Sequence, residues 1–247
     1  MIVLKADWEI EKMRQAGALT AKVRDYVAAL VRPGITTREL DEAARRFIEE
    51  RGGIPSFLGY EGFPASICAS VNGVVVHGIP GEQALREGDI ISLDLGVVVD
   101  GYHGDTAITV PVGKIAQRAQ QLLDVTRASL LAGVAQAVPG NHLSDISHAV
   151  ERVATEAGFS VVVDFVGHGI GREMHEDPQI PNYGPPGRGV QLRRGMVLAI
   201  EPMINMGGAD VRIRGDGWTV ETVDGLPSAH FEHTVAVGDP PDVLTAP

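Results

Sequence analysis

The sequence predicts an α/β (α+β) fold of two pseudo-symmetric halves, in which antiparallel sheet is covered by helices. The first observation behind this prediction is repetition. The string His-Gly-Ile at 77–79 returns at 168–170, and the strand-like segment 85–94 returns at 192–201. The second is periodicity, because apolar residues at helical spacing precede each copy of these strings. Each half is therefore expected to contain two helices followed by strands.

The same repetition predicts how the chain is organised. We expect one domain of residues 1–247 with an internal repeat, about 7–111 and about 114–237. Residues 33–52 match 139–158 at a constant offset, which supports the repeat. Chance similarity of amphipathic helices is the alternative explanation for the helical parts alone. The period is too long and the copies are too few for a solenoid.

Two helices are expected at the start of the first half. Asp7 is a candidate N-cap for the first helix, because an aspartate side chain accepts hydrogen bonds from the free amides of a first turn. Pro33 and Gly34 are expected to end that helix. Thr36 followed by Glu39 matches the capping box of a second helix.

The second half is expected to begin in the same way. A third helix should run from about 115 to 137, and Ser144 is a candidate cap for a fourth helix that Gly158 closes. The segment 176–189 is rich in proline and glycine, so we expect an ordered surface loop there.

A β-hairpin is the best defined strand feature of the sequence. Residues 88–99 are mostly apolar and β-branched, and the Asp-Gly pair at 100–101 favours a two-residue turn. Such a turn pairs Gly96 with Asp105 across the two strands. Asp94 then lies diagonally opposite Asp105 on the same face, close enough for the two carboxylates to share a ligand.

Composition excludes several classes of protein. The chain is 44% hydrophobic and 21% charged, which is ordinary for a globular protein, and its net charge of −11 argues against a nucleic-acid partner. The one cysteine, Cys68, suits a reducing compartment. No run approaches the roughly 20 apolar residues of a membrane span, and charge appears too early for a signal peptide. We expect a cytoplasmic protein without a membrane partner.

Several carboxylates interrupt strand-like apolar segments. Asp94 lies within one such segment, Glu201 ends another, and Glu232 lies in a third that runs from 230 to 237. A carboxylate buried without a partner is very unfavourable, and clustered carboxylates repel unless cations hold them. With Asp105, the sequence therefore predicts a metal site. For Asp94, a bond to an arginine or a backbone amide remains the alternative.

A histidine would complete an N/O ligand set. His168 and His175 are both candidates, because they flank the flexible Gly-Ile-Gly string. Such a set suits Mn, Fe, Co or Zn better than Mg or Ca. Two divalent ions would balance four carboxylates and would supply a hydroxide nucleophile near neutral pH. No comparable signal distinguishes His103, His142, His148, His230 and His233.

The sequence resembles the bacterial methionine aminopeptidases of type I over essentially its whole length. All five metal-ligand positions of that family hold ligand residues here, and no long helical insertion of the type II enzymes is present. The resemblance implies a pita-bread fold, two α/β halves around a dinuclear centre. The segments that carry it are 72–80, 92–96, 103–106, 167–178, 199–203, 216–219 and 230–234.

The resemblance also implies roles for individual residues. The ligands of the two ions would be Asp94, Asp105, His168, Glu201 and Glu232. His175 would polarise the scissile carbonyl, His77 would bond the peptide nitrogen, and Glu201 would shuttle the proton. The methionine pocket would be lined by Tyr60, Phe63, Cys68, His77 and Trp218.

The implied substrate is the initiator methionine of a nascent polypeptide whose second residue is small. Phe57 and Met174 depart from residues common in bacterial members, and both are expected near the pocket. A monomer is expected, and docking near the ribosome would suit a nascent-chain substrate. Two alternatives remain open: a proline-specific aminopeptidase of the same fold, which typically has an additional N-terminal domain, and a catalytically silent binding module.

Overall fold

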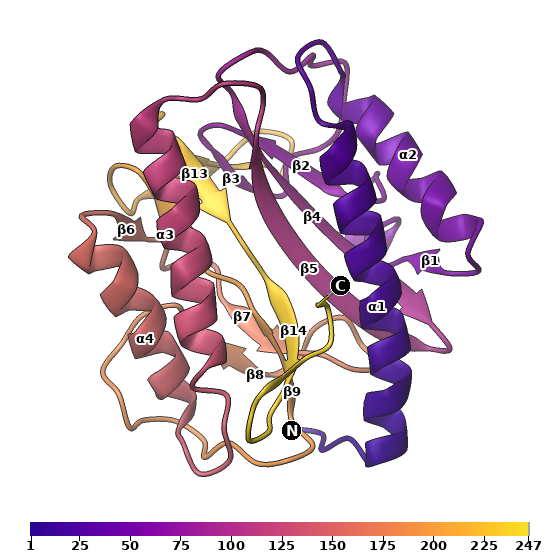
Figure 1. Ribbon diagram of the computed structural model, residues 1–247, viewed down its shortest axis with the longest axis vertical. Helices are drawn as coiled ribbons and strands as arrows, with labels where there is room; N and C mark the ends of the chain where they lie inside the picture. Colours follow the sequence, from indigo (N-terminus) through magenta and orange to yellow (C-terminus); the bar gives the residue numbers. More distant parts are fainter. Residues whose placement is uncertain (247) are drawn as a thin grey trace.

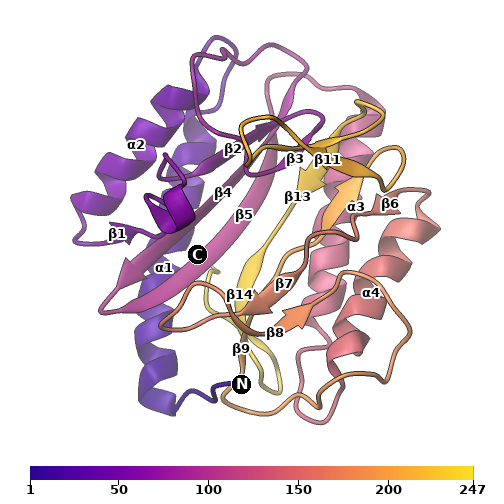
Figure 2. The same ribbon diagram turned by 180° about the vertical axis from the view of Figure 1, so that it is seen from behind.

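The computed structural model describes residues 1–246 and has the mixed helix and antiparallel-sheet architecture that the sequence predicts. Figure 1 shows the helices in front of the strands, and Figure 2 shows the strands from behind. The helices therefore cover one face of the sheets. They are α1 (Asp7–Leu30), α2 (Thr37–Glu49), α3 (Gln117–Val134) and α4 (Leu143–Glu156).

Two sheets hold most of the strands that matter for the site. The first has the order β1-β4-β2 with β5 on the other edge of β4, and the second has the order β15-β14-β9-β7-β8. The first sheet consists of β1 (Ile54–Pro55), β2 (Cys68–Val71), β4 (Ile90–Val99) and β5 (Tyr102–Pro111). The second consists of β7 (Gly167–Gly169), β8 (Glu176–Ile180), β9 (Val197–Ile200), β14 (His233–Ala236) and β15 (Asp242–Val243).

Two smaller three-stranded sheets and a short 3-10 helix complete the fold. One sheet has the order β13-β10-β6 and the other the order β11-β12-β3. Their strands are β3 (Val74–Val76), β6 (Ser160–Val161), β10 (Met203–Asn205), β11 (Val211–Ile213), β12 (Val220–Thr222) and β13 (Ser228–His230), and the 3-10 helix is η1 (Tyr60–Gly62).

The β4–β5 hairpin is confirmed in the predicted register. Val99 pairs with Tyr102 and Gly96 with Asp105, so the turn consists of the Asp-Gly pair at 100–101. Helix α1 lies directly on this hairpin. A Cβ atom at Gly104 would come within 2.8 Å of the backbone of Gly17, so the strand can approach the helix this closely only because position 104 is glycine.

Threonine side chains join β5 to β13 and to β14. The Thr234 hydroxyl donates to the Asp105 carbonyl at 2.8 Å and accepts from the Asp105 amide at 3.0 Å. Thr109 makes the same pair of bonds with His230, both at 2.8 Å. The Glu232 amide donates to a carbonyl of β5 at 2.9 Å. These bonds hold Asp105 and Glu232 beside each other although they are far apart in the sequence.

The predicted helix boundaries are mostly confirmed, but two predicted caps are wrong. The capping box is present, since the Thr36 hydroxyl accepts from the Glu39 amide at 3.2 Å. Asp7 is the first helical residue of α1 rather than its cap. The residue at the cap position is Ala6, and its amide donates to the Glu9 carboxylate at 3.0 Å. Ser144 lies inside α4, which begins one residue earlier. Its hydroxyl accepts from the Arg188 amide at 2.7 Å, which ties a loop to the helix.

Two strand predictions also need correction. The segment 176–189 is not a loop throughout, because its first five residues form β8 against β7. The strand expected over 230–237 is interrupted: β13 ends at His230, β14 begins at His233, and Glu232 lies between them. This break leaves the Glu232 amide free to bond the Ala107 carbonyl of β5, beside the threonine bonds described above.

The core consists of two main clusters beneath the two pairs of helices. One packs α1 and α2 against the first sheet around Leu40, Ile67 and Leu93. The other packs α3 and α4 against strands of the second half around Leu122 and Leu198. Among residues 1–246, no helix combines the length and apolar character needed to cross a membrane.

Candidate active site

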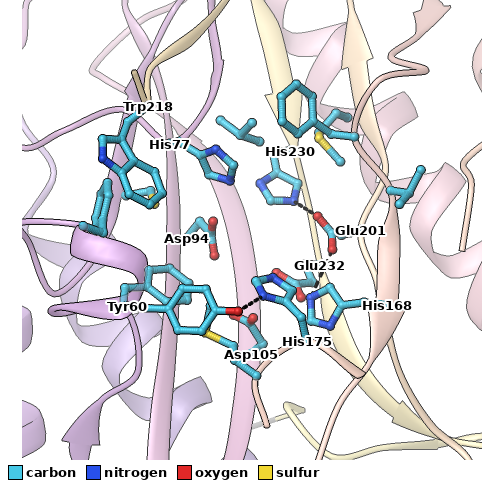
Figure 3. Close-up of a pocket in the computed structure, with 18 of the residues that line it drawn as sticks. Tyr60, His77, Asp94, Asp105, His168, His175, Glu201, Trp218, His230 and Glu232 are labelled. Atoms are coloured by element: carbon cyan, nitrogen blue, oxygen red, sulfur yellow. Dashed lines mark hydrogen bonds and ion pairs between the residues drawn. The ribbon is translucent and has the colours of Figure 1, made fainter. Parts of the chain in front are cut away.

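A cavity of about 200 Å³ lies where the two sides of the molecule meet, and Figure 3 shows its side chains. Every residue that the sequence analysis proposed for the site lines this cavity, as do Phe57 and Met174. The structure therefore brings together Tyr60, Phe63, Cys68, His77, Asp94, Asp105, His168, His175, Glu201, Trp218 and Glu232.

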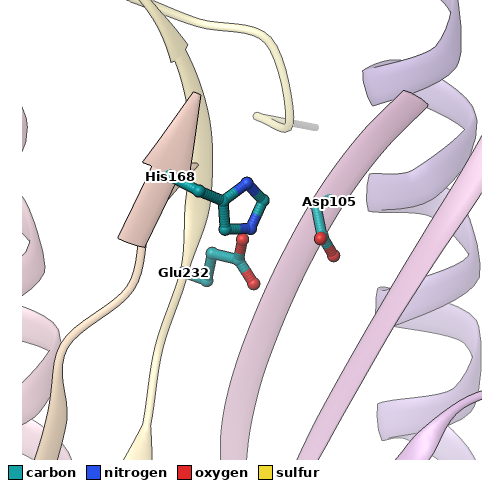
Figure 4. Close-up of side chains that lie close together, drawn as sticks. All are labelled: Asp105, His168 and Glu232. Atoms are coloured by element: carbon teal, nitrogen blue, oxygen red, sulfur yellow. The ribbon is translucent and has the colours of Figure 1, made fainter. Parts of the chain in front are cut away.

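The centre of the cavity holds one histidine and two carboxylates. Asp105 comes from β5, His168 from β7, and Glu232 from the break between β13 and β14. One possible ligand atom of each lies within 4.8 Å of the others, and all three residues are buried (Figure 4). This set has the spacing of a metal site, and its three residues come from segments that are far apart in the sequence.

Glu201 lies directly after β9, between two histidines. One carboxylate oxygen is 3.4 Å from Nε2 of His168, and the other is 3.7 Å from Nε2 of His230 (Figure 3). Desolvation lowers the pKa values of both histidines to about 3, so both are neutral at pH 7. Glu201 therefore faces two neutral imidazoles and is not neutralised by a positive side chain.

Burial determines the protonation of the carboxylates. Desolvation raises the pKa of Asp94 to about 7, and it raises the pKa values of Asp105, Glu201 and Glu232 well above their usual range. For the last three, repulsion by neighbouring carboxylates adds to the effect of burial. Burial is the cause of the raised pKa of Asp94, and its carboxylate forms no ion pair with an arginine among residues 1–246.

The donor set fits divalent ions. Several buried atoms around the centre have no hydrogen-bond partner among residues 1–246, namely Asp105 Oδ1, Glu232 Oε1 and His230 Nε2. Buried polar atoms are normally paired, so unpaired carboxylate oxygens facing a shared space indicate that a cation completes them. Imidazole and carboxylate ligands together match Mn, Fe, Co or Zn.

One side of the cavity is apolar. Phe57, Phe63, Cys68 and Met174 are buried and pack against one another, and Trp218 packs against the same cluster. The rings of Phe63 and Trp218 meet edge to face with centroids 5.1 Å apart. Burial raises the pKa of the Cys68 thiol, which keeps it neutral as a small apolar group. This apolar wall suits a flexible uncharged side chain.

Two further histidines line the cavity between the apolar wall, formed by the cluster around Phe63, and the acidic centre, formed by the metal-site carboxylates and His168. His77 follows β3 with φ of 58°, a left-handed conformation that is strained for histidine. His175 precedes β8, and its Nδ1 lies 2.7 Å from the Tyr60 hydroxyl. Desolvation lowers the pKa of His77 to about 4 and also lowers that of His175. Both are therefore neutral groups that can offer one hydrogen bond to a ligand.

Sequence reasoning missed His230 as a site residue. Its side chain is buried, lines the cavity and faces Glu201. Its place two residues before Glu232 is a signal that could have indicated this, but only with the strand break between them known. His103, also given no role, instead contacts the Ser56 hydroxyl at 2.9 Å through Nδ1.

Comparison with known proteins identifies the class. Residues 11–239 match the family model described as metallopeptidase family M24. The match covers most of the chain, including every residue of the acidic centre. The chain therefore belongs to metallopeptidase family M24, and this membership together with the Asp105, His168 and Glu232 group supports the use of divalent metal.

Within that family, the chain belongs to the bacterial methionine aminopeptidases of type I. It is 52% identical over 246 residues to methionine aminopeptidase 1 of Bacillus subtilis, with 99% of each chain covered. The crystal structure of methionine aminopeptidase from Rickettsia prowazekii superposes with a TM-score of 0.98 at 42% identity, with all of both chains covered. That from Thermotoga maritima gives the same TM-score and coverage at 44% identity. These superpositions confirm the pita-bread fold.

Proposed function

We propose that this protein removes the N-terminal methionine from nascent polypeptides whose second residue is small. The observation that carries the proposal is the junction of two surfaces in one cavity. An apolar wall suited to a thioether side chain lies beside a histidine and carboxylate centre suited to divalent ions. The relatives that match nearly the full length of this chain are named methionine aminopeptidases, which supports the same function.

We propose that Asp94, Asp105, His168, Glu201 and Glu232 would hold two divalent ions, of Co, Mn, Fe or Zn. When bound, such ions polarise a carbonyl and lower the pKa of an attacking water. Their positive charge also removes the repulsion that raises the pKa values of these carboxylates.

The remaining steps belong to side chains of the cavity. Glu201 is the proposed proton acceptor and donor, because its carboxylate lies 3.4 Å from His168 and 3.7 Å from His230, and both of these imidazoles are neutral. With the Tyr60 hydroxyl donating to Nδ1, neutral His175 carries its proton on Nε2 and can donate it to the scissile carbonyl oxygen. Desolvation raises the pKa of Tyr60, which keeps its hydroxyl protonated for this bond.

His77 is proposed to contact the peptide nitrogen. It lines the cavity next to Trp218, and the two rings lie with centroids 6.3 Å apart. A peptide whose methionine side chain lies against the apolar wall would place its first peptide bond near this histidine. The strained backbone at His77 is consistent with a side chain held in position for function.

A preference for a small second residue is proposed from the contact between Tyr60 and His175. Both line the cavity and touch one another, so they limit the space beside the scissile bond. A bulky second side chain would have to displace one of them, which would disturb the group that donates to the carbonyl.

We propose a cytoplasmic monomer that meets nascent chains and can dock at the ribosome. We also propose that the chain is one domain with an internal repeat. The order α1-α2 before β4 and β5, and α3-α4 before β9 and β14, supports the repeat.

Cleavage of short peptides tests the function directly. The purified protein should be treated with a chelator and then assayed with Met-Ala-Ser, Met-Leu-Ser and Met-Pro-Ser, with and without added Co or Mn. We expect metal-dependent release of free methionine from Met-Ala-Ser and little from Met-Leu-Ser. Activity confined to the proline peptide would instead indicate the proline-specific alternative. No release from folded, metal-loaded protein would indicate a binding module.

A further inference from the structure

Lys5 is a charged residue buried just before α1. Its side chain is only 4% exposed, and Nζ lies 2.5 Å from Glu176 Oε2 and 3.2 Å from the Val3 carbonyl oxygen. The Lys5 amide also donates to the Gly195 carbonyl at 2.7 Å. The backbone that carries Lys5 is therefore fixed, and its side chain reaches across to the residue that follows His175.

Glu176 binds a loop as well as the lysine. Its second carboxylate oxygen, Oε1, accepts from the amides of Arg172 at 3.1 Å and of Glu173 at 3.4 Å. The carboxylate side chain is 11% exposed. One largely buried carboxylate thus connects Lys5, near residue 1, with two amides of the segment 171–175.

The segment 171–175 is built around this ion pair. A Cβ atom on Gly171 would lie 2.6 Å from Lys5 Cε and would overlap the Glu176 carboxylate. The Gly171 carbonyl accepts from the His103 amide at 2.9 Å, which fixes the beginning of the segment. Its end carries two side chains that line the cavity, Met174 and His175.

We propose that the ion pair between Lys5 and Glu176 positions His175 for the reaction. A buried ion pair is a weak source of net stability, because desolvation offsets the attraction, but it can select one conformation. A group that donates to a reacting carbonyl has to be held within about 0.5 Å of its productive place. Lys5 is thus a positioning residue that acts through the 171–175 segment. This inference rests on the proposed function for its kinetic consequences.

Replacement of the lysine by a methionine of similar shape tests the proposal. Lys5→Met should lower kcat on Met-Ala-Ser about tenfold with KM changed much less, because the methionine pocket is left in place. Lys5→Arg should restore much of the loss. Lys12→Met is the matched control, since the contact of Lys12 on α1 with Asp100 is 3.6 Å long and exposed to solvent. The kcat of this variant should equal that of the wild type.

A double-mutant cycle separates positioning from a general structural effect. If Lys5 acts through His175, Lys5→Met should cause little further loss of kcat in a His175→Ala background. An equal loss in both backgrounds would overturn the proposal, as would wild-type kcat in folded Lys5→Met protein. Where Lys5→Met alone does not fold, the pair Lys5→Met with Glu176→Gln, which removes both charges and keeps an acceptor oxygen, undergoes the same measurement.

Amide hydrogen exchange tests, without any assay of turnover, whether the ion pair between Lys5 and Glu176 holds the 171–175 segment. We expect amide exchange in metal-free Lys5→Met protein to be faster than in metal-free wild-type protein, and the increase to be confined to the amides of Arg172 and Glu173. In a separate titration, the variant should bind metal with the wild-type stoichiometry. Unchanged exchange at these amides would overturn the proposal. This measurement also separates the proposed function from the proposed role of Lys5. A wild-type protein that cleaves no peptide would refute the function, while the exchange data would still show whether Lys5 holds the 171–175 segment.

Discussion

The two surfaces of the cavity are held in place by different forces. The acidic centre, made of Asp105, Glu232 and their neighbours, consists of groups that repel one another, and it is fixed by hydrogen bonds between backbones and threonine hydroxyls. The apolar wall around Phe57, Phe63 and Met174 consists of side chains that pack together by themselves. One surface is complete without a ligand and the other is not.

This difference indicates which surface depends on metal. A packed apolar cluster gains free energy from its own burial, about 25 cal/mol per Å² of apolar surface. Clustered carboxylates lose free energy until a cation joins them. Loss of metal should therefore disturb the acidic centre and leave the wall nearly intact, and changes to the wall should alter substrate preference without loss of metal.

The largest expected effect comes from the acidic centre. Glu232→Ala removes a proposed carboxylate ligand of the metal between β13 and β14. We therefore expect kcat/KM to fall by about 10³-fold or more and the metal content to be reduced. Turnover of Met-Ala-Ser and metal content by elemental analysis check this prediction. Glu82→Ala, at a side chain 74% exposed, is the control and should change neither quantity. Wild-type turnover in Glu232→Ala would refute the metal assignment.

His175 should affect catalysis without affecting metal. Because His175 lies between the two surfaces and bonds Tyr60, its replacement by alanine should lower kcat by about 10²-fold while metal content stays unchanged. Steady-state kinetics and metal analysis on the same preparation check this. If the metals were lost as well, His175 would be a metal ligand, which would contradict its placement next to the ligands.

Removal of metal should make stability depend on pH. Asp94 has a folded-state pKa of about 7 against an ordinary 3.8, so the stability it contributes at low pH is lost as pH rises through about 7. The buried histidines have lowered pKa values, so they reduce stability only as pH falls below their ordinary 6.5. Between pH 6.5 and about pH 8, the carboxylates alone should determine the slope.

We therefore expect the Tm of metal-free protein to fall by about 3 °C or more over that range, and saturating Mn to abolish the fall. Thermal denaturation at a series of pH values checks this, and Asp94→Asn should show a smaller slope. The same fall with metal bound would contradict the view that cations neutralise the acidic centre.

The smallest expected effect comes from the wall. Met174→Ala should cost about 2 kcal/mol of stability and raise KM for methionine peptides a few-fold, with metal content unchanged. Met13→Ala is the matched control, because Met13 is fully buried in a separate cluster, and it should lower stability without changing KM. Denaturant unfolding and kinetics with Met-Ala-Ser measure both quantities. An unchanged KM for Met174→Ala would separate this residue from the methionine pocket.

Local sequence was enough for the first half of the acidic centre. The two-residue turn at 100–101 determines the register of β4 and β5, so the positions of Asp94 and Asp105 follow from counting along the hairpin. The Thr36 and Glu39 capping box is local in the same sense, since its partners lie within one turn. Ser144 failed as a cap because its hydroxyl bonds a distant loop instead, which no local pattern reveals.

The second half of the centre depends on contacts between distant segments. His168, Glu201 and Glu232 come from three separate places, and only the pairing of β7, β9 and β14 makes them neighbours. The role of His230 could not be seen locally for the same reason, because it arises from the position of its imidazole opposite Glu201 and from two bonds between its backbone and Thr109 of β5. Sequence repetition predicted which residues should meet, but it did not give their geometry.

The sequence by itself determined the residue types of the site, the hairpin register and the family resemblance. All of these depend on order along the chain and on side-chain chemistry. The tertiary structure alone decided that the threonine bonds align Asp105 with Glu232, that Glu201 lies between two neutral histidines, and that Lys5 reaches Glu176. The physical reason is that such contacts form between residues far apart in the chain, where local propensity has no influence and only the packing of whole elements sets the distances.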